Sequence, residues 1–332
     1  MPVYNSELYI KEAIDSILNQ TFSDFELIII DDASTDKSVE IIQSYTDSRI
    51  QLILKPKNSG YTNSLNYGLT IAKGEYIARM DSDDISLPTR FEKQVAFLEV
   101  NSDVVLCGTA FKHIHNDFYV SVPEQNDQIK VGMLQECKIG HPTVMMRTSF
   151  LKKHQLTYNT LMEPAEDYDL WTRMIHLGKF HNLQEPLLRY RVHENQVSSK
   201  RNLLQIQKAL QIKSNLFFNL DKTPSSREVE AYKSVLFVSD KSMISDFLIF
   251  LKLKKKMICS NNDSNYFDKK LFNNFLSSIE ESFMKYYFKK RLSYNFKIFA
   301  DYVKIFNKTS YKLDINSFFK FILKCIIFYK VK

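Results

Sequence analysis

Three aspartates, Asp81, Asp83 and Asp84, stand within four residues at the end of an apolar run, in the stretch EYIARMDSDDISLP. Carboxylates this close repel one another unless the site is well solvated or holds a positive charge. The pair Asp81 and Asp83 suits a hard divalent cation, since Mg²⁺ and Mn²⁺ prefer a few carboxylates together with substrate phosphate oxygens. Asp84 is equally well explained as a helix start, because aspartate caps helices and Pro88 fits a first helical turn.

A second acidic cluster, DDASTD, begins with Asp31 and Asp32 directly after another apolar run. Asx and serine turns have the same composition, so the stretch by itself leaves a turn and a ligand contact equally open. Its place after a predicted strand matches that of Asp81 and Asp83, which favours the ligand contact.

A third group of acids, Glu166, Asp167 and Asp169, crowds the start of a helix that is predicted to begin near Pro164 and to end at Gly178. Acids in a first helical turn gain about 0.3–1 kcal/mol from the helix dipole, and three are more than that purpose needs. The functional interpretation is a carboxylate that acts as general base toward a hydroxyl group.

Two histidines are weaker candidates. His141, in IGHPTVMMR, and His193, in YRVHENQVS, each stand alone, and a single histidine is more often structural. His193 follows a predicted strand and lies two residues after Arg191, so a contact with a diphosphate or a metal is the second interpretation.

An alternation of strands and helices must position these groups. The apolar spacing predicts helices at residues 5–20, 37–45 and 60–72, and strands at residues 25–30, 50–54 and 75–80. This order predicts βαβ units and a largely parallel sheet. Ligands of such sheets bind beyond the carboxyl ends of the strands, so we expect the first two acidic clusters on one rim.

Six segments of residues 1–200 occur in an order shared with a known family: MPVYN, ILNQTFSDFELIIIDDASTD, AKGEYIARMDSDDISLPTRFEKQVAFLE, HPTVMMR, EDYDLW and YRVHENQVS. As a set they resemble family 2 glycosyltransferases of the GT-A fold, most closely members that build bacterial surface polysaccharides. The resemblance implies an α/β, Rossmann-like catalytic domain at residues 1–200, with a mixed, mainly parallel sheet flanked by helices, and a helical region after it.

The resemblance also implies roles for single positions. Pro2 and Tyr4 match the segment that lines the nucleobase pocket, and Asp32 matches the acid that reads the uracil. Asp83 matches the direct metal ligand of the Asp-x-Asp motif, with Asp81 nearer the ribose.

Asp167 matches the catalytic base, and His193 matches a contact to metal or diphosphate. His141, Glu166 and Arg191 are further candidates for contacts with donor or acceptor. The implied reaction is an inverting transfer from a UDP-sugar to a glycan or a lipid-linked acceptor, with Mn²⁺ or Mg²⁺ as cofactor.

The sequence departs from the family pattern in two places. The first strand is almost missing before Tyr4, so either this strand is unusually short or a few residues before it are lost. Ser64 and Leu65 stand where members often carry an Ala-Arg pair, so we expect one basic contact to the donor to be absent.

Charge divides the chain near residue 200. Residues 1–200 contain 20 basic and 27 acidic side chains, whereas residues 201–332 contain 25 and 11, and no glycine follows Gly178. We therefore expect a separate basic, aromatic and helical region at residues 201–332.

The basic region contains two apolar runs broken by lysines, residues 247–258 and 318–332. They are too short to span a bilayer but suit a helix that lies on an anionic membrane surface. An ordinary helical subdomain with solvated lysines is the alternative. Nucleic acid is a poor candidate partner, since no recognisable binding motif accompanies the charge.

The four cysteines are scattered, with no C-x-x-C pair, which indicates a reducing compartment and neither a zinc site nor a disulfide framework. The first residues lack the charged start and apolar run of a signal peptide, and no segment has the ~18 apolar residues of a membrane span. We expect a cytoplasmic protein, peripheral at the inner face of the cell membrane.

Two rival functions follow from the same residues. One is a nucleotidyltransferase on a similar α/β sheet, which would release pyrophosphate in place of UDP. The other is a membrane-docked module that binds a nucleotide-sugar without turning it over, which a defective first strand would make credible.

Overall fold

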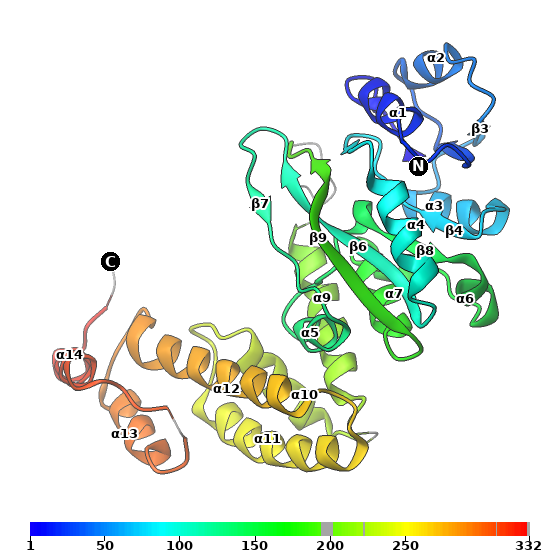
Figure 1. Ribbon diagram of the computed structural model, residues 1–332. Coiled ribbons are helices and arrows are strands. Elements are labelled where there is room, and N and C mark those ends of the chain that lie inside the picture. Colours follow the sequence, from blue (N-terminus) through cyan, green and yellow to red (C-terminus); the bar gives the residue numbers. More distant parts are fainter. Residues whose placement is uncertain (194–201, 222, 310, 331–332) are drawn as a thin grey trace. The chain divides into compact units, whose positions relative to one another are not determined.

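The computed structural model describes residues 1–193, 202–221, 223–309 and 311–330. The chain forms two compact units, Met1–Ile212 and Lys213–Lys332 (Figure 1). The first unit is α/β and the second is helical, which confirms the predicted fold class. The boundary that the charge pattern predicts, at residue 200, lies outside the described residues.

A three-stranded parallel sheet begins the first unit. Its order is β1 (Pro2–Val3), β2 (Leu27–Asp31) and β3 (Ile50–Leu54). Helices α1 (Ile10–Leu18) and α2 (Ser38–Gln43) pack on each other beside this sheet (Figure 1). The apolar residues of α1 recur at helical spacing, and that face is buried: Ile10, Ala13, Ile14 and Ile17.

A second, mixed sheet forms the centre of the unit. Its strand order is β4 (Tyr76–Ala78), β8 (Met145–Arg147), β6 (Val104–His113), β9 (Lys179–Tyr190) and β5 (Ile85–Ser86), with β7 (Tyr119–Val120) paired to β6. The two long strands, β6 and β9, run parallel, and the other described pairs of this sheet are antiparallel. The carboxyl end of β9 therefore meets the start of β5, where the aspartate loop ends.

The remaining helices of the first unit are α3 (Tyr61–Ile71), α4 (Arg90–Val100), α5 (Asn126–Gly132), α6 (Thr148–Lys153), α7 (Glu166–Met174) and α9 (Asn202–Phe218), which contains the unit boundary. Helix α4 packs against β6 and β9 (Figure 1). Its buried Arg90 donates to the carbonyl of Arg79 at 2.8 Å, and its buried Gln94 donates to that of Thr143 at 2.8 Å. These bonds fix the two loops that carry the candidate site.

Among the described residues, no strand of one sheet pairs with a strand of the other. β1 has only two residues and pairs with β2, whereas β4 pairs with β8. A cavity of about 640 Å³ lies between them, lined by apolar side chains that include Ile28, Leu69, Ile77 and Phe91. The expectation that Asp32 and Asp81 share the rim of one sheet is therefore wrong, because β2 and β4 belong to different sheets.

The second unit contains α10 (Ser226–Leu236), α11 (Ile244–Ser264), α12 (Lys269–Lys285), α13 (Phe296–Ile305) and α14 (Ile315–Ile326). Aromatic side chains form its core; the rings of Phe247 and Phe283, for example, stack with centroids 4.4 Å apart. Among the described residues, no helix has the length and apolar character needed to cross a membrane.

The run at residues 247–258, one of the two predicted membrane-surface segments, lies in α11. Its apolar side chains face the core of the unit: Phe247, Phe250, Leu253 and Met257 are each at most 1% exposed. Lys252 and Lys255 on the same helix are exposed. Residues 247–258 thus fit the alternative interpretation, a helix of an ordinary helical subdomain with solvated lysines.

Candidate functional site

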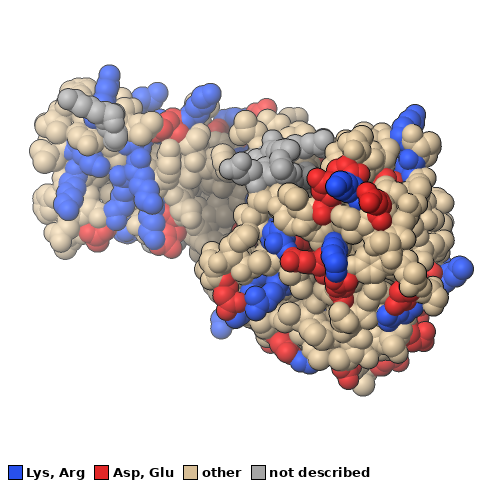
Figure 2. Space-filling model, turned by 90° about the horizontal axis from the view of Figure 1, so that it is seen from above, with Lys and Arg blue, Asp and Glu red and all other residues tan. Residues whose placement is uncertain are grey.

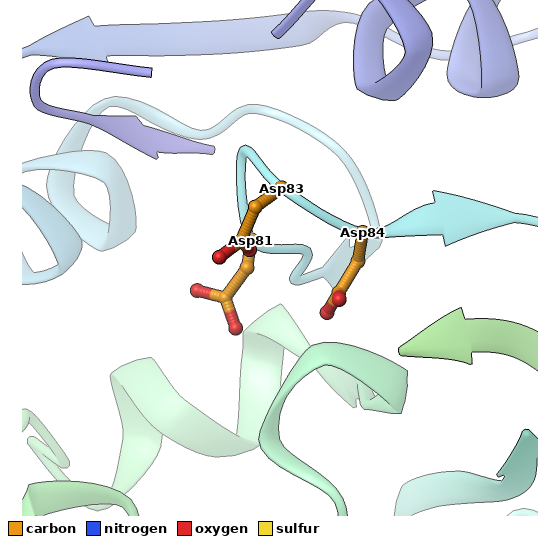
Figure 3. Close-up of side chains that lie close together, drawn as sticks. All are labelled: Asp81, Asp83 and Asp84. Atoms are coloured by element: carbon orange, nitrogen blue, oxygen red, sulfur yellow. The ribbon is translucent and has the colours of Figure 1, made fainter. Parts of the chain in front are cut away.

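The three aspartates lie on the loop between β4 and β5. Their side chains project from the same side of this loop (Figure 3). One carboxylate oxygen from each, of Asp81, Asp83 and Asp84, lies within 4.8 Å of the others. The cluster is thus compact enough for one cation, as the sequence spacing predicts.

Arg79 neutralises part of this charge. Its Nη1 donates to Asp81 Oδ2 at 2.6 Å, and its Nη2 lies 2.5 Å from Asp81 Oδ1 in an ion pair; the Arg79 side chain is 7% exposed. Burial, the largest single effect, lowers the pKa of the Arg79 guanidinium, but the charge and hydrogen bond of Asp81, together with the charges of Tyr158 and Glu166, outweigh it, so the pKa is raised overall. Arg79 is therefore a permanent buried cation beside the cluster.

Asp83 contacts the residues that follow β9. His193 Nε2 lies 2.9 Å from Asp83 Oδ2, and Arg191 Nε donates to the backbone carbonyl of Asp83 at 2.8 Å. Burial, followed by the charge of Asp81, raises the pKa of the Asp83 carboxyl. The structure thus brings Arg191 and His193, more than 100 positions away in sequence, to the aspartate loop.

Asp84 occupies a different environment. Its side chain is fully buried, and Oδ1 accepts from the backbone N–H of Arg191 at 2.9 Å. Its Oδ2 is buried with no hydrogen-bond partner among the described residues. Burial, and then the charges of Asp81 and Asp83, raise its pKa well above the ordinary value. Asp84 ties β5 to the residue after β9. The explanation of Asp84 as a helix start is wrong, because β5 follows it directly and α4 begins only at Arg90.

The first two residues of α7 present two acids with different surroundings. Glu166 is 2% exposed, and Tyr61 Oη donates to it at 2.6 Å. Burial, followed by the charge of Asp167, raises the pKa of Glu166 to about 8. The Asp167 side chain keeps 22% exposure and accepts from the N–H of Tyr168 at 2.7 Å. Burial also raises the pKa of Asp167, but this acid is the more accessible of the two.

His141 stands beside both acids. Its Nδ1 lies 3.9 Å from Glu166 Oε1 and 3.9 Å from Asp167 Oδ2, while Nε2 lies 3.0 Å from Tyr158 Oη. Burial, followed by the charge of Arg79, lowers the pKa of His141 well below the ordinary value. The ring is therefore neutral near pH 7, so it contributes hydrogen bonding and shape without a charge.

The carboxylate of Asp32 already has protein partners. It accepts from the N–H groups of Ser59 and Gly60, at 3.0 and 2.8 Å, and Lys55 Nζ lies 2.6 Å from its Oδ1. Gly60 has φ = 90°, a conformation that favours glycine and that aims its N–H at Asp32. Asp32 thus shapes the loop before α3.

The loop after β1 connects the first two acidic clusters. Asn5 N donates to Ser34 Oγ at 3.0 Å, and Ser6 Oγ lies 2.8 Å from Ser82 Oγ, between Asp81 and Asp83 in sequence. Pro2 is partly buried in β1, and Tyr4 in this loop is 49% exposed. The clusters are therefore brought together by this loop, although their strands belong to different sheets.

Sequence reasoning missed several groups at the site. Arg79 stands two residues before Asp81, and this short spacing at a strand end was the available signal. Lys55, at the end of β3, carried no signal by itself. Its Nζ lies 3.0 Å from Ser64 Oγ, so a cation stands beside Ser64 even though Leu65 replaces the basic residue that family members often have.

Comparison with known proteins identifies the family. A profile described as Glycosyl transferase family 2 matches residues 1–164. An uncharacterized glycosyltransferase of Haemophilus influenzae is 37% identical over 235 residues, 66% of this chain and 72% of that protein. The chain belongs to glycosyl transferase family 2 and is a glycosyltransferase, which confirms the resemblance seen in the sequence.

Two further relatives come from Escherichia coli. The O-antigen biosynthesis glycosyltransferase WbnJ is 37% identical over 205 residues, 58% of this chain and 78% of WbnJ. The second, WfaP, is named a UDP-Glc:alpha-D-GlcNAc-diphosphoundecaprenol beta-1,3-glucosyltransferase. It is 34% identical over 201 residues, 60% of this chain and 78% of WfaP.

Solved structures share the fold. Staphylococcus aureus TarS, residues 1–349 in complex with UDP-GlcNAc, has a TM-score of 0.57 and 18% identity, covering 86% of this chain and 90% of that one. The mannosyltransferase PcManGT of Pyrobaculum calidifontis, in complex with GDP-Man and Mn²⁺, has a TM-score of 0.51 and 14% identity, covering 85% of each chain. At these identities the likeness concerns the fold alone.

Proposed function

We propose that this glycosyltransferase moves a sugar from a UDP-sugar to a hydroxyl group of a glycan or lipid-linked acceptor, with inversion at the anomeric carbon, in surface polysaccharide synthesis. One observation carries the proposal: a compact aspartate cluster, with carboxylate oxygens within 4.8 Å of one another, occurs together with the partly exposed carboxylate of Asp167, whose pKa is raised by burial and, less strongly, by the charge of Asp81. A cation site and a base within reach of each other are what such a transfer requires.

The names of similar proteins support the donor and the pathway class. WfaP is named for a UDP-glucose donor and a diphosphoundecaprenol acceptor, and WbnJ is named for O-antigen biosynthesis. TarS was solved with UDP-GlcNAc, whereas PcManGT was solved with GDP-Man. We favour UDP over GDP because the relatives with higher sequence identity include the UDP-glucose enzyme.

The aspartate cluster fits Mn²⁺ or Mg²⁺. Carboxylate oxygens are the ligands that these cations prefer, and three of them stand within 4.8 Å of one another. We assign Asp83 as the direct ligand, with Asp81 nearer the ribose and His193 as a contact to metal or diphosphate. When bound there, the cation supplies positive charge that stabilises the diphosphate as it leaves.

Asp167 is the proposed base. It accepts the proton of the acceptor hydroxyl while that oxygen bonds to the anomeric carbon, and the bond from this carbon to the diphosphate breaks with its electron pair leaving on UDP. Attack from the face opposite the leaving group inverts the carbon. Glu166, which is buried, bonded to Tyr61 and has a pKa of about 8, is the less suitable base near pH 7.

We assign the donor contacts to β1 with the loop after it and to the loop before α3. We assign the exposed Tyr4, with Pro2, to the nucleobase pocket. A direct contact of Asp32 with uracil would use the remaining acceptor capacity of Oδ2, which accepts from the N–H of Gly60, since a carboxylate oxygen can accept more than one hydrogen bond. We assign Arg191 to positioning Asp83.

Glu166 and the neutral His141 remain candidates for the acceptor side. For the whole chain we propose a cytoplasmic location, with the basic second unit at the anionic inner face of the cell membrane and no nucleic acid partner.

Product release tests the proposal. UDP and pyrophosphate are assayed side by side, with a panel of UDP-sugars, Mn²⁺ and a lipid-linked acceptor. We expect UDP. Pyrophosphate would indicate a nucleotidyltransferase, and neither product would indicate a binding module.

Two variants separate the roles of the acids. Asp83→Ala is expected to lose UDP binding in the presence of Mn²⁺. Asp167→Asn is expected to keep UDP binding and to lose transfer by a factor of ~10² to 10⁴, the usual contribution of a general base. Glu166→Gln is the matched control on the same turn of α7, and its transfer rate is expected to fall much less. Unchanged turnover in Asp167→Asn contradicts the assignment of the base.

A further inference from the structure

Helix α14 is packed into the second unit by a narrow face. Phe321 and Cys325 are each 1% exposed, and the Phe321 ring lies against Phe288 and Tyr302, with centroids 5.4 and 5.3 Å apart. The rest of the helix surface does not share this burial, although it also carries large apolar side chains.

The opposite side of α14 exposes these apolar side chains. The exposed fractions are 74% for Ile315, 65% for Phe319, 58% for Leu323, 54% for Ile326 and 57% for Ile327. Steps of four, four, three and one residue place them along one side of a helix. We call these five residues the α14 stripe. Contiguous exposed apolar surface of this kind marks an interaction site.

The start of α13 extends the stripe. Phe328, directly after it in sequence, is 53% exposed, and its ring meets that of Phe296 edge to face, with centroids 5.2 Å apart. Phe296, the first residue of α13, is itself 59% exposed. The apolar surface therefore includes residues from both helices.

The charge around this surface is strongly positive. Residues 289–330 contain ten basic and two acidic side chains. Asp301 is buried, and Asp314 lies 3.3 Å from Lys289, so neither acid balances the exposed lysines. Lys320 is exposed on α14 itself. Figure 2 shows blue basic side chains, with fewer red acidic ones, among the tan side chains of the second unit.

We propose that the α14 stripe, with Phe328 and Phe296, lies in the interface of an anionic lipid bilayer, its apolar side chains toward the acyl region and the nearby lysines at the headgroups. A helix with an exposed apolar side and flanking lysines is typical of this location. Pairing with a second copy through this face would bring the two sets of lysines together, which like-charge repulsion disfavours. The inference rests on the proposed function and deepens it by naming the surface that reaches a membrane-held acceptor.

Flotation of the full chain with vesicles tests the inference. Vesicles of phosphatidylcholine alone are compared with vesicles containing phosphatidylglycerol, at low salt. The variant Phe319→Ser/Leu323→Ser changes two exposed residues, and we expect at least about tenfold weaker binding to the anionic vesicles. The control, Lys252→Gln/Lys255→Gln, removes two exposed lysines from α11, whose apolar side is buried, and is expected to bind nearly as the unchanged chain does.

Several results would overturn the inference: equal binding of the stripe variant and the unchanged chain, equal binding to neutral vesicles, or no binding at all. Light scattering that shows a dimer broken by Phe319→Ser/Leu323→Ser would assign the stripe to a second copy. Far-ultraviolet circular dichroism, which reports the helices of the second unit, is the folding control for the stripe variant, since the proposed UDP site lies in the first unit. If the unchanged chain does not bind UDP in the presence of Mn²⁺, this counts against the proposed function. Failure of the membrane inference and failure of the proposed function are therefore distinguishable.

Discussion

The guanidinium of Arg79 donates from Nη1 to Asp81 Oδ2 at 2.6 Å, and its Nη2 lies 2.5 Å from Asp81 Oδ1. This ion pair explains how three aspartates coexist within four residues, because a buried cation offsets part of their repulsion before any metal binds. Asp81 is thus engaged by the protein itself, and a cation or ribose that uses it must compete with Arg79.

Arg79→Met is therefore expected to strengthen Mn²⁺ binding. The variant frees Asp81 and removes a positive charge beside the cluster. Hydrogen bonds to charged groups contribute about 1.5–3 kcal/mol, and about 1.4 kcal/mol corresponds to tenfold in affinity, so we expect roughly tenfold tighter binding. Electron paramagnetic resonance of free Mn²⁺ measures this without any turnover.

Arg79→Lys is the matched control for this experiment, because it keeps the positive charge but loses the planar guanidinium and its paired N–H donors. Its Mn²⁺ affinity is expected to lie between that of the unchanged protein and that of the Arg79→Met variant. Weaker or unchanged Mn²⁺ binding in Arg79→Met would show that the guanidinium does not compete with the cation.

The variants Asp83→Asn and Asp84→Asn are expected to differ in how much Mn²⁺ raises their melting temperature. Asp83→Asn removes the proposed direct ligand, so the increase in melting temperature on adding Mn²⁺ is expected to be lost. Asp84→Asn keeps the acceptor for the Arg191 N–H and removes a carboxylate whose Oδ2 is buried without a described partner, so the Mn²⁺ effect is expected to remain. Thermal denaturation with and without Mn²⁺ measures both, and loss of the effect in Asp84→Asn would make Asp84 a ligand.

The sequence predicts the local elements well because their signals are local. The strand at residues 50–54 matches β3, and the helix at residues 60–72 matches α3 (Tyr61–Ile71) within a residue at each end. Strand partners are set by distant residues, so the division into two sheets did not follow from the pattern. β4, for example, pairs with β8, about 70 positions later.

The same reasoning applies to side chains. The spacing of Asp81 and Asp83 predicts a compact cluster, whereas the burial of Arg79 beside Asp81 depends on tertiary packing. Composition could not separate α11 from α14, since both mix phenylalanine, leucine or isoleucine with lysine. Only packing decides that Phe250 is buried and Phe319 is 65% exposed.

Glu166 is expected to make the stability of the first unit depend on pH. Burial, followed by the charge of Asp167, raises its pKa from 4.5 to about 8 in the folded protein, so the folded state holds a proton that the unfolded state releases above about pH 4.5. This contribution to stability is fully present below pH 4.5 and is lost as the pH rises through 8.

In Glu166→Gln the contribution is absent, so the melting temperature of the variant relative to the unchanged protein is expected to rise by about 4 °C or more between pH 5 and pH 8. Tyr61→Phe removes the hydrogen bond that favours the charged carboxylate, so the pKa of Glu166 is expected to rise further and the loss of stability to extend to higher pH. Calorimetry across this range measures all three proteins, and parallel curves for Glu166→Gln and the unchanged chain would show that Glu166 ionises normally.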